Sequence, residues 1–254
     1  MTLNHRREGS GPPLLLVHGF GISFNIWERL RPLLGAHFQL VMVELPGIGD
    51  SPRPAPGSDY LEASVEGIEE LRRALRIERW AVLGYSSGTR VAEAYVSAHA
   101  ARVSAAIFLC PLLIGIYKAG CLGLALRLDG LAPAAGDWVL SGWRLRWLIS
   151  WLAFNLRRDA RRADWYAEIG AAPRPVLKDT LRAAAPMARG DLAVQAPYAR
   201  IWADRDLVPA RPRRPGAHDY FVHGRHAAPV ESAEEIAELI VSFLEGDEAD
   251  GASA

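Results

Sequence analysis

A serine between two glycines is the feature of this chain that most directly suggests chemistry. Ser86 is the centre of the pattern G-x-S-x-G at residues 84–88, between an apolar run at 80–83 and an Ala-, Val- and Glu-rich stretch at 89–99. A serine on such a sharp strand-to-helix turn exposes its hydroxyl, and the two glycines leave room for the tight backbone. The following helix points N–H groups at the same place. The pattern therefore predicts a serine beside a site that stabilises an oxyanion.

A base and an acid are needed to make such a serine reactive. The hydroxyl needs a base within hydrogen-bond reach, and the base needs a third group that fixes its tautomer. Downstream, one segment after an apolar run carries Asp204 and Asp206, and the next carries His223 and His226. Functional groups of α/β sheets gather at the carboxyl ends of the strands, so all four side chains are candidates.

Apolar runs alternate with helix-like stretches along most of the chain. Strands are predicted at 14–17, 38–44, 80–83, 103–109, 198–202 and 220–222, and helices at 24–34, 60–75, 89–99 and 232–244. Ser232 and Glu235 have the spacing of a capping box for the last helix. Strands that are apolar on both faces are typical of a parallel sheet covered on both sides. The sequence predicts an α/β fold with a mostly parallel central sheet and helices on both faces.

The alternation is interrupted in the middle of the chain. Residues 112–190 contain no predicted strand but hold five of the tryptophans, namely Trp138, Trp143, Trp147, Trp151 and Trp165. We interpret this segment as a helical insertion into a core made of residues 1–111 and 191–246. Residues 247–254 are acidic and small, and we expect them to form a disordered tail.

Composition limits the partners and the location that can be expected. Lys+Arg and Asp+Glu both number 29, which gives no electrostatic case for binding nucleic acid. The two cysteines form neither a disulfide framework nor a metal cluster. No apolar segment has the length of a signal-peptide core or a membrane span. We therefore expect a cytoplasmic protein without stable membrane insertion, and the sequence does not indicate its oligomeric state.

Five segments together resemble the α/β-hydrolase family over nearly the whole chain. They are L-L-L-V-H-G-F-G at 14–21, E-L-P-G-I-G-D-S at 44–51, G-Y-S-S-G at 84–88, A-D-R-D-L-V-P at 203–209 and G-R-H-A-A-P-V-E-S at 224–232. The order Ser, acid, His is also that of the family. The resemblance implies an α/β-hydrolase fold in which the insertion is a helical cap over the active site.

The resemblance also assigns roles to individual residues. It implies that Ser86 is the nucleophile, Asp206 the acid and His226 the base, and that the backbone N–H groups of Phe20 and Ser87 form the oxyanion hole. It favours Asp206 over Asp204 and His226 over His223.

Several further residues receive expectations from the same comparison. It implies that His18 holds the oxyanion loop and that Glu44 orients the loop at 46–50. The side chains expected to line an apolar substrate pocket are Tyr85, Trp143, Trp147 and Met187. Two departures from the family are a missing hairpin before the strand at 14–17 and a short segment between Asp206 and His226.

The expected reaction is hydrolysis of a carboxylic ester with an apolar acyl or aryl group, without a metal or organic cofactor. Serine at position 86 disfavours a dehalogenase or epoxide hydrolase, because these relatives use a carboxylate nucleophile. Hydrolysis of a carbon–carbon bond and cofactor-free perhydrolysis, as in a haloperoxidase-like enzyme, are alternatives on the same residues. A ligand-binding relative without turnover is the non-enzymatic alternative.

Overall fold

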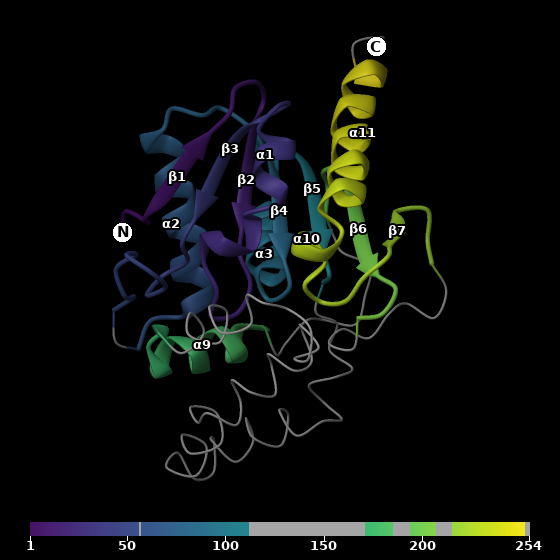
Figure 1. Cartoon of the computed structure of the whole chain (residues 1–254). Helices are drawn as coiled ribbons and strands as arrows, with labels where there is room; N and C mark the ends of the chain where they lie inside the picture. Colours follow the sequence, from purple (N-terminus) through teal and green to yellow (C-terminus); the bar gives the residue numbers. More distant parts are fainter. Residues whose placement is uncertain (56, 112–170, 185–193, 207–214, 252–254) are drawn as a thin grey trace.

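A single twisted sheet organises the protein (Figure 1). The structure is a computed structural model that describes residues 1–55, 57–111, 171–184, 194–206 and 215–251. Its seven strands lie in the order β1-β3-β2-β4-β5-β6-β7. They are β1 (His5–Glu8), β2 (Pro13–Val17), β3 (Gln39–Val43), β4 (Trp80–Tyr85), β5 (Val103–Leu109), β6 (Tyr198–Ala203) and β7 (Asp219–Val222). All neighbouring pairs are parallel except β1 and β3, so the expected mostly parallel α/β sheet is confirmed.

Helices cover both faces of this sheet. The elements between and after the strands are η1 (Phe24–Trp27), α1 (Leu30–Leu34), α2 (Tyr60–Ala74), α3 (Gly88–Ala98), η2 (Ala100–Arg102), α9 (Arg174–Ala184), α10 (Ala228–Glu231) and α11 (Ala233–Gly251). Residues of α1 and α11 pack with one face of the sheet, and residues of α2 and α3 pack with the other. Alternate residues of β2 enter the two cores, because successive side chains of a strand point to opposite faces.

The edge strand β1 was not predicted. It pairs antiparallel with β3, with His5 opposite Val43 and Glu8 opposite Leu40. β1 is separated from β2 by β3 in the sheet, so the two strands do not form a hairpin. The four residues of β1 are polar and partly exposed, which suits a sheet edge but leaves no apolar pattern to recognise.

The C-terminal helices also differ from the prediction. The helix expected at 232–244 begins at Ala233 and continues to Gly251, so residues 247–251 of the expected disordered tail are helical. The predicted capping box, in which each of the two side chains would bond the backbone N–H of the other residue, is not formed. The Ser232 hydroxyl donates to the carbonyl of His223, and Glu235 accepts from the His223 N–H at 3.0 Å. Both side chains therefore stabilise the loop that leads to His226.

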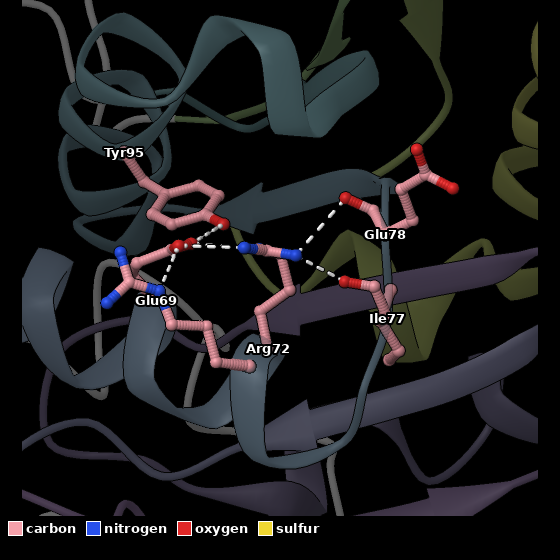
Figure 2. Close-up of polar contacts among 6 residues, drawn as sticks. Glu69, Arg72, Ile77, Glu78 and Tyr95 are labelled. Atoms are coloured by element: carbon pink, nitrogen blue, oxygen red, sulfur yellow. Dashed lines mark hydrogen bonds and ion pairs between the residues drawn. The ribbon is translucent and has the colours of Figure 1, made fainter.

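A buried ion pair connects the helices of one face (Figure 2). Arg72 of α2 donates to both carboxylate oxygens of Glu69, at 2.8 and 2.9 Å, and Tyr95 of α3 donates to the same carboxylate at 3.1 Å. Arg72 also donates to the carbonyls of Ile77 and Glu78, which precede β4. The Arg72 hydrogen bonds are the main cause that lowers the pKa of Glu69 to about 2. The pair thus joins α2 to α3 and to the entry of β4, and β4 and α3 are the elements on either side of Ser86.

Replacing Arg72 with methionine is expected to lower the free energy of unfolding by about 3–5 kcal/mol, because it leaves a buried carboxylate without its cation. Arg73→Met is the matched control. Arg73 also contacts Glu69, but its side chain is 68% exposed against 8% for Arg72. Its loss should cost about 0–1 kcal/mol. Urea denaturation of the two variants measures the difference, and equal losses would contradict a special role for the buried pair.

Candidate active site

Ser86 lies on the turn between β4 and α3, as the sequence predicts. Its backbone has a φ of 54°, in the left-handed region that costs a residue other than glycine about 1–3 kcal/mol. The Ser86 N–H donates to the carbonyl of Leu109 at 3.0 Å, and the Thr89 hydroxyl donates to the Ser86 carbonyl at 2.5 Å. A Cβ at Gly84 would come within 2.7 Å of the Ala92 Cβ, and one at Gly88 would collide with the His18 carbonyl. Both glycines therefore permit the close approach that forms the turn.

Three side chains from distant parts of the sequence meet at this turn. The Nε2 atom of His226 is 2.7 Å from the Ser86 hydroxyl, and its Nδ1 atom is 2.7 Å from Oδ2 of Asp206. All three residues are buried, with exposed fractions of 4–6%. The carboxylate can only accept, so Nδ1 carries the proton and Nε2 is free to accept the Ser86 proton. This is the orientation that a general base requires.

The alternative aspartate and histidine pair with each other instead. Nδ1 of His223 is 3.0 Å from Oδ2 of Asp204, and Oδ1 of Asp204 accepts from the Gly224 N–H at 2.9 Å. The Gly224 hydrogen bond is the main cause that lowers the pKa of Asp204. The two side chains are 41% and 62% exposed. The pair therefore connects two exposed loops, and neither side chain contacts the Ser86 hydroxyl.

The loop after β2 passes directly beside the serine. A Cβ at Gly19 would lie 3.0 Å from the Ser86 Cβ, so the chain that carries Phe20 is in close contact with the turn. Within the described residues, the backbone N–H groups of Phe20 and Ser87 have no hydrogen-bond acceptor. Both are therefore available to a bound oxygen atom, as an oxyanion hole requires.

His18 is a buried, neutral histidine that holds the loop after β2 in place. Its Nε2 atom accepts from the Leu45 N–H at 2.9 Å, so Nδ1 carries the proton and donates to the Gly19 carbonyl at 2.8 Å. Burial lowers the pKa of His18 to about 4. The imidazole thus links the end of β3 to the loop that carries Phe20. The geometry agrees with the expectation that His18 holds the oxyanion loop.

Glu44 fixes the neighbouring loop. Its buried carboxylate accepts from the Asp50 N–H at 2.8 Å, from Asn4 Nδ2 at 2.7 Å and from the Ser23 hydroxyl. These contacts tie together residues 44–50, the N-terminal segment and the loop after β2. They agree with the orienting role expected for this residue.

Two further buried residues lie against His226 and Asp206, and the sequence did not indicate these contacts. The hydroxyl of Tyr85 donates to the His226 carbonyl at 2.6 Å, and its ring lies 5.4 Å from the imidazole. Tyr85 is fully buried at 1% exposure, so it packs against His226 and does not line an open pocket. Cys110, directly after β5, is also fully buried. Its position at the carboxyl end of a strand was the only signal that could have pointed to it.

The Cys110 sulfur, an Asp206 oxygen and a His226 nitrogen lie within 4.8 Å of one another. Burial raises the pKa of the Cys110 thiol well above its usual range, and the nearby Asp206 carboxylate acts in the same direction. A metal ion at these three atoms would compete with the hydrogen bond that orients His226. The thiol is therefore a neutral neighbour of the carboxylate.

The remaining pocket predictions, Trp143, Trp147 and Met187, lie outside the described residues, as does most of the predicted cap. The described part of the predicted cap is residues 171–184, which include α9. Figure 1 shows α9 at the end of the sheet where the parallel strands terminate. Within the part of the chain that the structure describes, no helix combines the length and apolar character needed to cross a membrane.

Comparisons with known proteins agree with the fold. The sequence profile of the alpha/beta hydrolase fold matches residues 12–130. A solved hydrolase from Pseudomonas aeruginosa PA01 superimposes with a TM-score of 0.78 at 23% identity, over 95% of this chain and 94% of that one. The chain therefore has the alpha/beta hydrolase fold.

Two curated relatives differ in the chemistry that their names describe. Pimeloyl-[acyl-carrier protein] methyl ester esterase of Aeromonas salmonicida (strain A449) is 26% identical over 96% of this chain and all of its own length. Fluoroacetate dehalogenase of a Burkholderia species is 36% identical, over 35% of this chain and 31% of its own length. The fold is thus clear, whereas the reaction must be argued from the site.

Proposed function

We propose that this protein is a serine hydrolase that cleaves carboxylic esters through Ser86, His226 and Asp206. The hydrogen-bonded chain from the Ser86 hydroxyl through both imidazole nitrogens to Asp206 is the observation that carries the proposal. Serine at position 86 separates it from the dehalogenase relative, for which the family resemblance implies a carboxylate nucleophile. The esterase relative, matched along its whole length, supports an ester as substrate.

Acylation follows from the geometry of these side chains. The Ser86 Oγ forms a bond to the ester carbonyl carbon while its proton passes to Nε2 of His226. Asp206 stabilises the resulting imidazolium through Nδ1. The negative charge on the former carbonyl oxygen is stabilised by the N–H groups of Phe20 and Ser87. When the carbon–oxygen bond to the alcohol breaks, Nε2 returns the proton to the leaving oxygen.

Water completes the reaction through the same base. A water molecule attacks the acyl-enzyme carbonyl and gives its proton to Nε2 of His226. The bond between the carbonyl carbon and Ser86 Oγ then breaks, and the proton returns to Oγ as the acid leaves. The preference for an apolar acyl or aryl group rests on the aromatic composition of residues 112–190.

A fluorophosphonate probe and an ester panel test the proposal. We expect one probe per chain, located on Ser86 by peptide mass spectrometry, and release of nitrophenol from p-nitrophenyl esters of increasing acyl length. The chain-length optimum measures the size of the apolar pocket. Turnover of a vinylogous diketone without turnover of any ester would replace ester hydrolysis by carbon–carbon hydrolysis. Absence of both labelling and turnover would support a binding protein.

A further inference from the structure

A second concave site lies beside the oxyanion loop. It is a cavity of about 420 Å³ whose walls are the segment after β2, the loop at 44–53, residues 171–173 and Arg6 of β1. Gly21, next to Phe20, belongs to its wall, whereas Ser86 and His226 do not. The cavity is therefore adjacent to the proposed reaction centre but separate from it.

Two arginines give this cavity its chemical character. Arg6 extends from β1 and places its guanidinium carbon 4.4 Å from the ring centroid of Phe24, a cation–π contact with a buried aromatic ring. Arg53 stands between two prolines, on a loop closed by a hydrogen bond from the Gly47 N–H to the Pro52 carbonyl. Neither guanidinium has an ion-pair partner among the described residues.

Among the described residues of the wall there is one carboxylate, and it already accepts hydrogen bonds from neutral donors. Glu44 accepts from the Asp50 N–H, the Asn4 amide and the Ser23 hydroxyl. These donors hold its oxygens inside the loop framework. The described part of the wall thus carries two guanidinium groups and one carboxylate, and its net positive charge favours an anion.

The strand order sets the distance between this cavity and the serine. Glu44 follows β3 and Ser86 follows β4, with β2 between them. Two strand spacings correspond to roughly 10 Å along the edge of the sheet. A single extended substrate can therefore occupy both places.

We infer that the cavity is a subsite for the anionic end of the ester substrate, a carboxylate or a phosphate remote from the scissile carbonyl. Arg6 and Arg53 bind the anion through charge-assisted hydrogen bonds, while the intervening chain of the substrate passes along the loop that carries Phe20. This inference rests on the proposed function and names the substrate class: esters with a remote acidic group.

Matched substrates test the subsite. The substrates are the mono-p-nitrophenyl ester of suberic acid, p-nitrophenyl octanoate as its neutral counterpart of equal length, and a third ester of that length ending in a phosphate monoester. For the Arg6→Met/Arg53→Met double variant we expect kcat/KM for the preferred anionic ester to fall by about 10–100-fold, because hydrogen bonds to a charged group are lost. The octanoate ester should change less than about twofold. The anionic ester with the larger loss identifies the anion.

Arg7→Met is the control, because it removes the same positive charge from the same strand without changing the cavity. Arg7 is next to Arg6 on β1, is exposed and does not line the cavity. It should leave the ratio between the anionic and neutral esters unchanged. An unchanged ratio in the double variant would overturn the subsite and leave the ester hydrolase intact. Equal losses of kcat/KM on all esters would mean that the two arginines only balance the charge of Glu44. That result would also overturn the subsite.

Calorimetry with suberate separates this inference from the proposed function. We expect the wild-type protein to bind suberate and the double variant to bind it at least about tenfold more weakly. Arginine-dependent binding without hydrolysis of any ester would retain the anion subsite and reject the ester hydrolase. Equal affinity for suberate in both proteins would reject the subsite.

Discussion

Replacing Ser86 with alanine is expected to lower kcat for the best p-nitrophenyl ester by about a millionfold, because the bond-forming atom is lost. The melting temperature should stay close to that of the wild-type protein, since the Ser86 backbone, and not its side chain, makes the contacts with Leu109 and Thr89. Stopped assays at high enzyme concentration measure the residual rate.

The neighbouring serine is the matched control. Ser87 is also buried, at 3% exposure, and among the described residues its hydroxyl has no hydrogen-bond partner. Ser87→Ala keeps the backbone N–H that we assign to the oxyanion hole, so the loss of kcat should be less than about threefold. A large loss in Ser87→Ala with an active Ser86→Ala would exchange the roles of the two serines.

Residues that act as a unit also lose activity as a unit. His226→Ala should reduce kcat about as much as Ser86→Ala, and the double variant should be no slower than either single variant. If the loss of kcat in the double variant were the product of the two single losses, Ser86 and His226 would act in different steps. That result would contradict the direct 2.7 Å contact as the basis of nucleophile activation.

The central strands were predictable because their physical constraint is strong. A strand buried on both faces has to be apolar throughout, as 14–17 and 105–109 are, and such runs are visible in any sequence. The edge strand β1 has no such requirement, because one side faces solvent and its pairing with β3 depends on backbone groups alone. A short polar segment therefore carries no local signal of the partner that makes it a strand.

The site was predictable only in part. The glycines around Ser86 specify a backbone turn, which is a local property. The choice between Asp204 and Asp206 depends on two loops that remain paired beyond their strands: the Asp204 N–H donates to the Val222 carbonyl at 2.9 Å. This pairing leaves Asp204 at the surface with His223, whereas Asp206 reaches His226. Such a non-local arrangement was available only through the family resemblance.

Asp206→Asn is expected to lower kcat by about 10⁴-fold while the fold stays intact. The carboxylate only accepts hydrogen bonds, so it selects the tautomer of His226 with the proton on Nδ1. An amide can instead donate to Nδ1, which places the proton on Nε2 and removes the acceptor that Ser86 needs. The buried position of Asp206, at 4% exposure, leaves little water to restore the correct tautomer.

Asp204→Asn supplies the comparison for this prediction. The change is chemically identical, on the same loop and two residues away, but it affects a carboxylate that holds Gly224 and an exposed histidine. We expect less than about threefold loss of kcat and a small loss of stability. Steady-state kinetics of both variants on one ester, with circular dichroism to verify folding, decide between the two aspartates. A greater loss of kcat in Asp204→Asn would mean that the hydrogen bond between Asp206 and His226 is not the one that orients the base.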